Sequence, residues 1–375
     1  DLVKEELDNA WLAAAAQGKA PDYVQKATRP LVSNVLAAME ARCRLSDDDD
    51  FGWWLGKEPG PRNWLAMQNG ILDIAACAEG RDTLLPHSAD WFSCSMLPYP
   101  FEPLADCPRW REFLERNLEG DEERIAILQE FCGYLLTPST DEQKFLVLEG
   151  EGANGKGVFF GMLEALLSKS NISNVPLESF GARFALTPTL GCLVNVAPDC
   201  SELDRLAEGH LKSFTSGDRM MFDRKNKDPL MARPTARLII ATNNRPRFSD
   251  RSSGIWRRMI LLPFHVEIPA AERVKGMDKP AFWENHGELP GILNWAVMGL
   301  RRLTKQGDFT KSSVVDRALA EYRTEQNPAR EFLQTECEAS EDASTPCKKV
   351  YDKYKEWCAE NGHPQPLAAC LFGKE

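Results

Sequence analysis

The sequence lacks the patterns of a zinc protein and of a membrane protein. Its eleven cysteines form no C-x-x-C pair and its five histidines are scattered, so free thiols in a reducing cytoplasm fit better than a zinc cluster. No apolar stretch approaches the roughly 18 residues of a membrane span, because the strongest candidate, Ile255–Phe264, is interrupted by Arg257 and Arg258. No signal peptide opens the chain, which begins with Asp1 and not with Met. We therefore expect a processed chain or a segment of a longer one.

The overall composition is typical of a soluble globular protein. The 375 residues are 43% hydrophobic and 27% charged, which excludes a collagen, a coiled-coil rod and a fully disordered chain. The length predicts two or three domains. Domains of that size bury most of their apolar surface without help from disulfides or metals.

Positive charge is scarce overall but concentrated in one window. The chain has a net charge of −11, which taken alone argues against a nucleic-acid-binding protein. Between Lys212 and Arg258, however, twelve basic and four acidic residues give a charge of +8, so the rest of the chain carries −19. A basic segment in an acidic protein requires an explanation, and a negatively charged partner is one.

Strands and helices begin to alternate at Gln143, which predicts an α/β domain with a parallel sheet. Before this point, apolar spacing predicts helices over Leu31–Arg42, Asp106–Leu118 and Glu122–Leu136. Four apolar runs then predict buried strands, at Lys144–Leu148, Cys192–Ala197, Arg237–Ala241 and Met259–Phe264. Further helices are expected over Ala281–Leu303, Ser312–Thr324 and Cys347–Asn361.

A glycine-rich turn follows the first of these strands and matches G-x-x-x-x-G-K. Glycines allow successive backbone N–H groups to converge on phosphate oxygens, the following helix adds its N-terminal dipole, and the lysine reaches the β- and γ-phosphates of a nucleotide. The strand before the turn and the helical pattern after it make a plain glycine-rich turn the weaker interpretation. The residues expected to hold the phosphates are Gly150, Gly152, Asn154, Gly155, Lys156, Gly157 and Val158.

The loop departs from its motif at one position. Gly157 stands where serine or threonine normally offers a hydroxyl to Mg²⁺. The metal must then rely on water and on an acidic residue at the end of a neighbouring strand. Asp199, which follows Cys192–Ala197, is the expected metal ligand or water-activating residue, and Glu202 is a second candidate. Asp199 could instead cap the next helix.

Asn243 lies at the end of the third predicted strand, Arg237–Ala241. A side-chain amide beside the phosphate loop can orient the attacking water or contact the γ-phosphate. The alternative is an ordinary turn, because Asn-Asn-x-Pro is a normal turn sequence. The position of Asn243 relative to the other motifs favours the catalytic interpretation.

Taken together, these motifs resemble the superfamily 3 helicases, in particular the phage- and plasmid-type primase-helicases related to the poxvirus enzyme. The core segments that carry the resemblance are Gly150–Gly157, Leu193–Asp199, Leu211–Asp218, Ala241–Pro246 and Gly254–Arg258. Outside the core, Asn69–Asp73, Cys107–Trp110 and Gln129–Leu136 resemble the domain that precedes the ATPase in that family, and Tyr351–Trp357 and Phe372–Glu375 resemble the winged helix that follows it.

The resemblance implies an α/β fold with an AAA+-type P-loop ATPase core over 141–270. A mainly helical domain (1–140) would precede it, and a helical extension (271–335) and a partial winged-helix-like unit (336–375) would follow. It also implies a ring, usually hexameric, that encircles one DNA strand and moves 3′ to 5′, with ATP and Mg²⁺ bound between subunits. Arg258, or in second place Arg257, carries over as the arginine finger given to the neighbouring subunit. A primase is expected upstream on a longer polypeptide or in trans.

The segment Met220–Pro234 has turn signals at Asn226 and Asp228-Pro229 between apolar flanks, and it predicts a β-hairpin. In a ring, this hairpin would point into the channel. Three cations near its tip, Arg224, Lys225 and Lys227, would then hold the DNA backbone without reading its sequence. The alternative is a solvated hairpin tip without a partner.

We therefore expect an ATP-dependent DNA helicase that replicates a phage, plasmid or integrated mobile element in the cytoplasm of a bacterial host, with single-stranded DNA as partner and no membrane. Two alternatives remain. A P-loop kinase would turn over ATP as a monomer, without stimulation by DNA. A replication initiator or loader would bind ATP mainly to drive assembly, and Gly157 slightly favours it.

Overall fold

The structure is a computed structural model, and it describes residues 9, 12–13, 16–18, 29–42, 53–54, 63–93, 95–137, 139–197, 205–243, 245–246, 248, 253–338, 340, 344–361 and 366–373. The chain divides into two units, residues 1–49 and residues 50–375. The first unit contains helix α2 (Arg29–Arg42), and the second contains all the elements below. Within the described ranges, no helix is long and apolar enough to cross a membrane.

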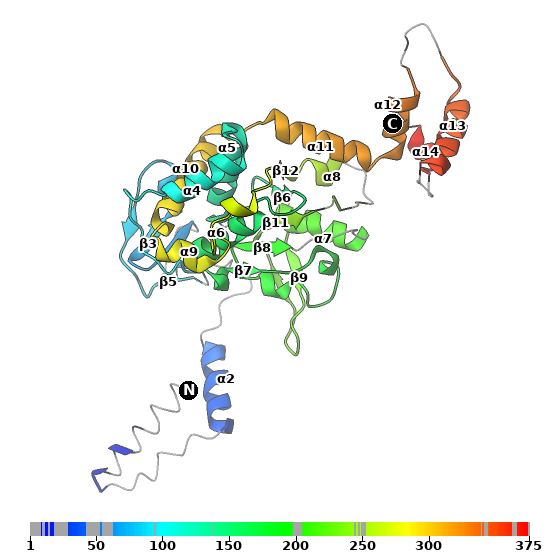
Figure 1. The fold of residues 1–375 in the computed structure, drawn as a ribbon. Coiled ribbons are helices and arrows are strands. Elements are labelled where there is room, and N and C mark those ends of the chain that lie inside the picture. Colours follow the sequence, from blue (N-terminus) through cyan, green and yellow to red (C-terminus); the bar gives the residue numbers. More distant parts are fainter. Residues whose placement is uncertain are drawn as a thin grey trace. The chain divides into compact units, whose positions relative to one another are not determined.

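A five-stranded parallel sheet forms the centre of the second unit (Figure 1). Its strand order is β12-β6-β11-β8-β7, and every neighbouring pair is parallel. Most residues of the long strands are buried, which explains why they read as continuous apolar runs. The four predicted strands are confirmed as β6 (Phe145–Glu149), β8 (Val194–Ala197), β11 (Arg237–Thr242) and β12 (Met259–Pro263). The short fifth strand, β7 (Ile172–Ser173), is not predicted by the sequence.

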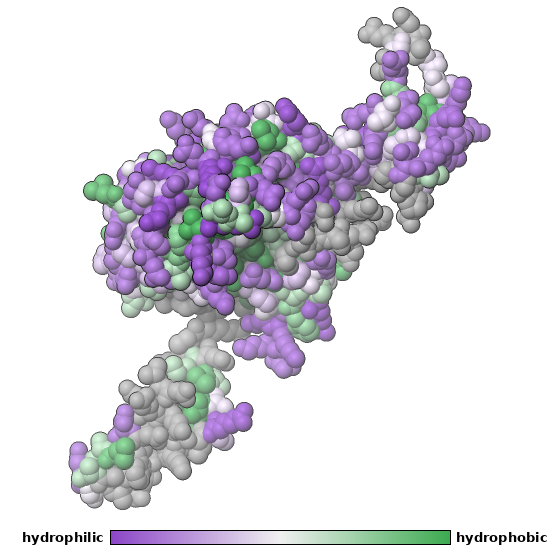
Figure 2. All heavy atoms as spheres, viewed as in Figure 1, coloured by the Kyte–Doolittle hydropathy of each residue, from purple (hydrophilic) through white to green (hydrophobic). Residues whose placement is uncertain are grey.

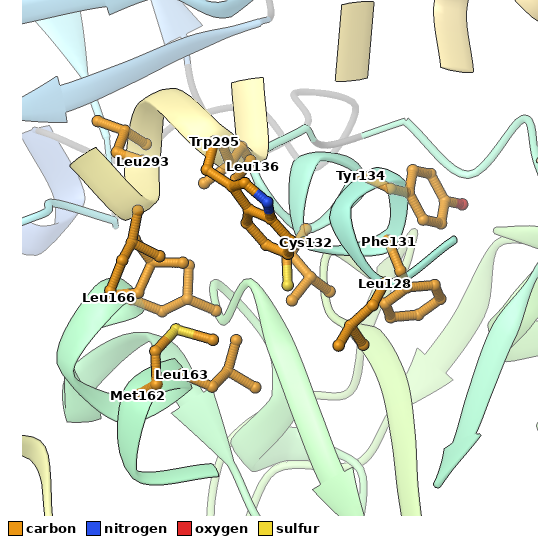
Figure 3. Packing of buried hydrophobic residues seen from close by; sticks show 14 of the residues in the cluster. Leu128, Phe131, Cys132, Tyr134, Leu136, Met162, Leu163, Leu166, Leu293 and Trp295 are labelled. Atoms are coloured by element: carbon orange, nitrogen blue, oxygen red, sulfur yellow. The ribbon is translucent and has the colours of Figure 1, made fainter. Parts of the chain in front are cut away.

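Four helices supply the largest share of one hydrophobic cluster that also includes this sheet, and Figure 3 shows part of that cluster. They are α4 (Pro108–Asn117), α5 (Glu122–Leu135), α6 (Lys156–Leu167) and α10 (Leu289–Gln306). Helices α5 and α10 approach closely because glycines face the partner's backbone. A Cβ on Gly133 would lie 2.4 Å from the Ala296 carbonyl oxygen, and one on Gly299 would lie 2.2 Å from the Gln129 carbonyl oxygen. No larger residue fits at either position without moving a helix.

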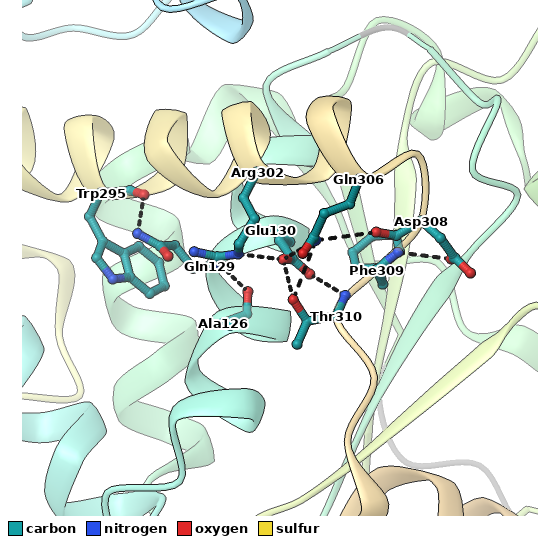
Figure 4. Close-up of polar contacts among 9 residues, drawn as sticks. All are labelled: Ala126, Gln129, Glu130, Trp295, Arg302, Gln306, Asp308, Phe309 and Thr310. Atoms are coloured by element: carbon teal, nitrogen blue, oxygen red, sulfur yellow. Dashed lines mark hydrogen bonds and ion pairs between the residues drawn. The ribbon is translucent and has the colours of Figure 1, made fainter.

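A buried carboxylate also joins this helix pair (Figure 4). Glu130 on α5 is fully buried. It accepts hydrogen bonds from Arg302 Nε at 2.6 Å, from Thr310 N at 2.8 Å and from Thr310 Oγ1 at 2.6 Å, and Gln306 Nε2 adds a fourth at 3.2 Å. The network fixes the end of α10 and the loop after it against α5.

The remaining elements surround this core. The hairpin predicted over Met220–Pro234 is confirmed, since β9 (Met220–Phe222) pairs antiparallel with β10 (Leu230–Ala232). A second hairpin is formed by β2 (Trp64–Met67) and β3 (Gly70–Asp73). The other strands are β1 (Trp53–Trp54), β4 (Leu84–Leu85) and β5 (Trp91–Phe92). The other helices are α3 (Ile74–Ala78), α7 (Arg205–Ser216), α8 (Ser253–Trp256), α9 (Pro280–Asn285), α11 (Ser313–Glu325), α12 (Pro328–Glu336), α13 (Cys347–Glu360) and α14 (Ala369–Phe372), with 3₁₀ turns at Lys169–Asn171, Leu177–Ser179, Thr187–Thr189 and Ala270–Glu272.

One predicted helix is wrong. The pattern over Ala281–Leu303 predicts a single helix, whereas the structure has α9 and α10 with a break between them. Gly287 adopts φ +67° in this break, a left-handed conformation that ends α9, and Pro290 occupies the first turn of α10. Apolar periodicity continues across the break because both helices bury one face.

The domain boundaries predicted at 140 and 270 remain predictions. One hydrophobic cluster joins α5, α6 and α10 across both positions, so the packing of the core does not mark a boundary at either. At the C-terminus, α12, α13 and α14 share a small cluster around Phe332, Tyr354 and Phe372. In the part of 328–373 that the structure describes, no strand accompanies these helices. The winged-helix-like unit is therefore not confirmed.

Candidate active site

The glycine-rich turn lies between β6 and α6, as the phosphate-loop motif predicts. Its shape depends on close backbone contacts. A Cβ on Gly150 would lie 1.9 Å from Asn154 Nδ2, and the same amide donates to the Phe264 carbonyl oxygen at 3.0 Å. Gly152 and Gly155 adopt φ +128° and +85°, which other residues rarely reach. The Asn154 side chain thus connects the loop to the end of β12 and stabilises the loop's conformation.

Lys156, the first residue of α6, has only 9% of its surface exposed. Its Nζ donates to the Gly150 carbonyl oxygen and, at 3.1 Å, to Asn243 Oδ1. Asn243 directly follows β11, the strand beside β6. The structure therefore brings together the lysine and the amide that the sequence places 87 residues apart. Gly157 and Val158 continue into the first turn of α6, where Gly157 is exposed.

The two predicted acidic residues lie outside the described residues, because the structure describes nothing between 197 and 205. The described part of β8 ends at Ala197, which pairs with Ile240 of β11. The carboxyl end of β8 thus lies at the same sheet edge as Asn243, two residues before Asp199. Among the described residues, no group of three His, Cys, Asp or Glu side chains could hold a metal. The roles of Asp199 and Glu202 remain predictions.

Arg245 is a residue of this sheet edge that the sequence did not single out. Its guanidinium contacts both carboxylate oxygens of Glu149, at 2.5 and 3.1 Å, and Glu325 of α11 at 2.6 Å. Burial disfavours its charge, but the hydrogen bonds to Glu149 and Glu325 prevail and raise the pKa of Arg245. Tyr322 adds a cation–π contact at 5.4 Å and donates its hydroxyl to the Pro246 carbonyl. Arg245 thus fixes the segment after Asn243 to the strand that leads into the phosphate loop.

The two arginines between α8 and β12 have different environments. Arg258 has 8% of its surface exposed and donates to the Gly254 carbonyl oxygen and to Ser216 Oγ, both at 2.6 Å. Burial and, next, the charge of Arg257 lower the pKa of Arg258. Arg257 is exposed. Arg258 is thus hydrogen-bonded within this chain, whereas Arg257 is exposed, and the role of either arginine as a finger remains a prediction.

The basic hairpin projects from the sheet domain, and hydrophilic residues cover its tip (Figure 2). Lys225 and Lys227 are exposed, whereas Arg224 is half-buried and donates from Nε to the Asp228 carbonyl oxygen at 2.9 Å. At the base, Thr187 donates to the Asp223 carbonyl oxygen at 2.5 Å. We call Arg224, Lys225 and Lys227 the hairpin cations. Two of them are exposed, and the third stabilises the turn.

Comparison with protein families gives three matches along the chain. A family described as D5 N terminal like matches residues 12–119, a family of unknown function matches 148–258, and a family described as Poxvirus D5 protein-like matches 324–375. The second match contains the phosphate loop, the hairpin and the arginine pair. The first match includes Asn69–Asp73 and Cys107–Trp110, which resemble the domain before the ATPase. The third includes Tyr351–Trp357 and Phe372–Glu375, which resemble the domain after it.

Individual relatives are distant. "Putative helicase L207/L206" of Acanthamoeba polyphaga mimivirus is 24% identical over 58% of this chain, and the match covers 25% of that protein. The chain thus spans about a quarter of the length of this curated relative. Two apo structures of the C-terminal region of NrS-1 match 74% and 70% of this chain and 63% and 58% of theirs, with 15% and 14% identity and TM-scores of 0.46 and 0.45. The family matches confirm the resemblance that the motifs predict: this chain is similar, from its N-terminal to its C-terminal segments, to the primase-helicases of phage and poxvirus type.

Proposed function

We propose that the chain is the motor of an ATP-dependent DNA helicase that acts in the replication of a phage, plasmid or integrated mobile element. One observation supports this most directly. The lysine of the phosphate loop meets Asn243 Oδ1 at 3.1 Å, at the carboxyl edge of a parallel sheet where α/β proteins bind ligands. In P-loop enzymes, catalysis consists mainly of positioning and of stabilising charge on the transferred phosphoryl group.

In this proposal, the backbone of Gly150–Gly157 and the amine of Lys156 hold the β- and γ-phosphates of ATP. Asn243 positions the γ-phosphate or the attacking water. Asp199 binds Mg²⁺ or polarises the water, and Glu202 assists or replaces it. Because Gly157 offers no hydroxyl, the protein would hold the metal through an acidic side chain, Asp199 or Glu202, together with water and the phosphates.

The second part of the proposal concerns DNA and assembly. The hairpin cations, of which Lys225 and Lys227 are exposed, suit sequence-independent binding to the backbone of a single strand. In a ring, usually of six subunits, the hairpins would line the channel and translocation would run 3′ to 5′. Arg257 is exposed just before the amino end of β12, at the end of the sheet opposite to the phosphate loop, and it would complete the ATP site of the neighbouring subunit. A primase would act upstream on the same polypeptide or in trans.

One observation favours a second candidate, a replication initiator or loader with little helicase activity. The phosphate loop lacks the hydroxyl that normally binds Mg²⁺, which would slow hydrolysis more than nucleotide binding. Such a protein would assemble with ATP and release phosphate very slowly, with or without DNA.

ATP turnover with and without single-stranded DNA, measured with sedimentation in the presence of ATP, separates these candidates. The helicase proposal expects stimulation by DNA and assembly into a ring. Lys156→Ala should abolish turnover, and Lys169→Ala should not, because Lys169 is exposed after the far end of α6. Assembly with ATP but negligible turnover would favour the initiator, and turnover by a monomer indifferent to DNA would favour a kinase.

A further inference from the structure

Asn243 is exposed, so burial in a core does not fix its position. It directly follows β11, and its Oδ1 accepts a hydrogen bond from Lys156 Nζ at 3.1 Å. In the proposed function this amide positions the γ-phosphate or the attacking water. How well it does so depends on how the chain on either side of Asn243 is held.

The chain before Asn243 is held by strand pairing. Thr242, the last residue of β11, is 1% exposed and pairs with Glu149 at the end of β6. Its carbonyl oxygen accepts a hydrogen bond at 3.2 Å from the N–H of Gly150, the first glycine of the phosphate loop. These contacts end at Thr242, so they fix where the next segment starts but not the course that it takes.

The chain after Asn243 is held by the side chain of Arg245. Its guanidinium donates to both carboxylate oxygens of Glu149, at 2.5 and 3.1 Å. The two side chains are 19% and 12% exposed, and a bidentate pair shielded from water in this way is stronger and more directional than a surface ion pair. Glu149 therefore holds the chain on both sides of Asn243, through its backbone and through its carboxylate.

Helix α11 holds the same segment as well. Arg245 Nη1 donates to Glu325 at 2.6 Å. The guanidinium also lies 5.4 Å from the ring centre of Tyr322, whose hydroxyl donates to the Pro246 carbonyl oxygen. Arg245 is thus the side chain that joins three parts of the fold: the strand before the phosphate loop, the segment after Asn243 and the last turns of α11.

We infer that Arg245 is a positioning residue for ATP hydrolysis, which acts by keeping the Asn243 amide beside Lys156 and the phosphate loop. The inference rests on the proposed function, since it requires Asn243 to act on the γ-phosphate or the attacking water. A displacement of about 1 Å can cost about 100-fold in rate. Release of the segment should therefore slow hydrolysis, while the loop backbone and Lys156 continue to bind the phosphates.

Steady-state ATP hydrolysis by the full chain tests this inference. Arg245→Gln should lower kcat about tenfold or more and leave KM within about twofold, because it removes positioning and not binding. Arg245→Lys should fall between wild type and Arg245→Gln, because a lysine can pair with one carboxylate but cannot form the bidentate contact. Arg317→Gln is the matched control and should change neither constant, since Arg317 is exposed on α11.

A double-mutant cycle with Asn243→Ala separates positioning from a general loss of stability. If Arg245 acts through Asn243, adding Arg245→Gln to Asn243→Ala should lower kcat by less than about twofold. The same fold-loss in both backgrounds would overturn the inference. An unchanged kcat in Arg245→Gln would also overturn it, as would a raised KM alone, which would mean that Arg245 only offsets the charge of Glu149 near the triphosphate.

Thermal unfolding verifies that each variant is folded, and Arg245→Lys takes the place of Arg245→Gln in the cycle if the latter does not fold. An unchanged kcat in Arg245→Lys would then overturn the inference. A different pattern marks failure of the proposed function itself. If the wild-type chain does not hydrolyse ATP, or if Lys156→Ala retains turnover, the phosphate loop does not serve the proposed reaction, and the inference falls with it.

Discussion

The buried carboxylate of Glu130 should stabilise the protein strongly, because four donors from α10 and the following loop converge on it. Removing one partner of a buried, hydrogen-bonded ion pair costs about 3–5 kcal/mol when the other stays buried. The Arg302 side chain is 33% exposed and also donates to the Ala126 carbonyl oxygen at 2.9 Å, so water and this carbonyl can partly replace the lost contact. We therefore expect Glu130→Ala to cost about 3 kcal/mol, at the lower end of that range.

Thermal unfolding of the full chain measures this loss. At about 2 °C per kcal/mol, the value for larger domains, the Tm should fall by roughly 6 °C. Glu130→Gln should lose less stability than Glu130→Ala, because it keeps one acceptor oxygen. It should still be less stable than the wild-type protein, because its amide group donates where the surrounding groups are also donors. Glu321→Ala is the control, since Glu321 lies exposed on α11. A Tm for Glu130→Ala within 1 °C of the control, on the order of the measurement error, would show that the network does not hold α5 and α10 together.

Three further predictions follow from other contacts. Gly299→Ala should lower stability by about 1–3 kcal/mol, as overpacking does, because its Cβ would meet the Gln129 carbonyl oxygen at 2.2 Å; an unchanged urea midpoint would contradict the close approach of α5 and α10. Mixing Arg257→Ala subunits with Lys156→Ala subunits should recover part of the ATPase activity that each variant loses, because the two changes affect different sides of a shared site. Arg258→Ala should instead lower the thermal stability of its own subunit. If no activity returns at any mixing ratio, with assembly verified, Arg257 does not act across an interface. Neutralising the hairpin cations should flatten the dependence of log K for single-stranded DNA on log[salt] by up to about two units, at about 0.7 per phosphate contact, with ATP affinity unchanged; an unchanged slope would place the DNA elsewhere.

The sequence predicts the elements whose pattern is local. The four longer strands of the sheet, the position of the glycine-rich turn between β6 and α6, and the hairpin over Met220–Pro234 are confirmed, because burial on both faces produces apolar runs and because turns require particular residues. β7 was missed because two residues form no detectable pattern. The break between α9 and α10 was missed because a single left-handed glycine interrupts two helices of the same periodicity.

The residues of the site that the sequence could not identify depend on contacts across long stretches of chain. Arg245 donates to Glu149 from 96 residues away, and Asn117 of α4 donates to the carbonyl oxygen of Asn154 in the glycine-rich turn from 37 residues away. The neighbours Arg257 and Arg258 differ only in which way each side chain points, and no periodicity in a turn reveals this. The position of Asn243 beside Lys156 could be inferred from the order of the strands, because strand ends in a parallel sheet meet at one edge, and its catalytic role remains a prediction.

Strand displacement tests the central claim most directly. The substrates are a forked duplex with a 3′ single-stranded tail and its 5′-tailed counterpart, each with one labelled strand. The account predicts that ATP drives release of the labelled strand from the 3′-tailed duplex, that Lys156→Ala abolishes the release and that Lys169→Ala retains it. ATP turnover and ring assembly without displacement of either duplex would contradict a helicase and leave the ATP site to an initiator or loader.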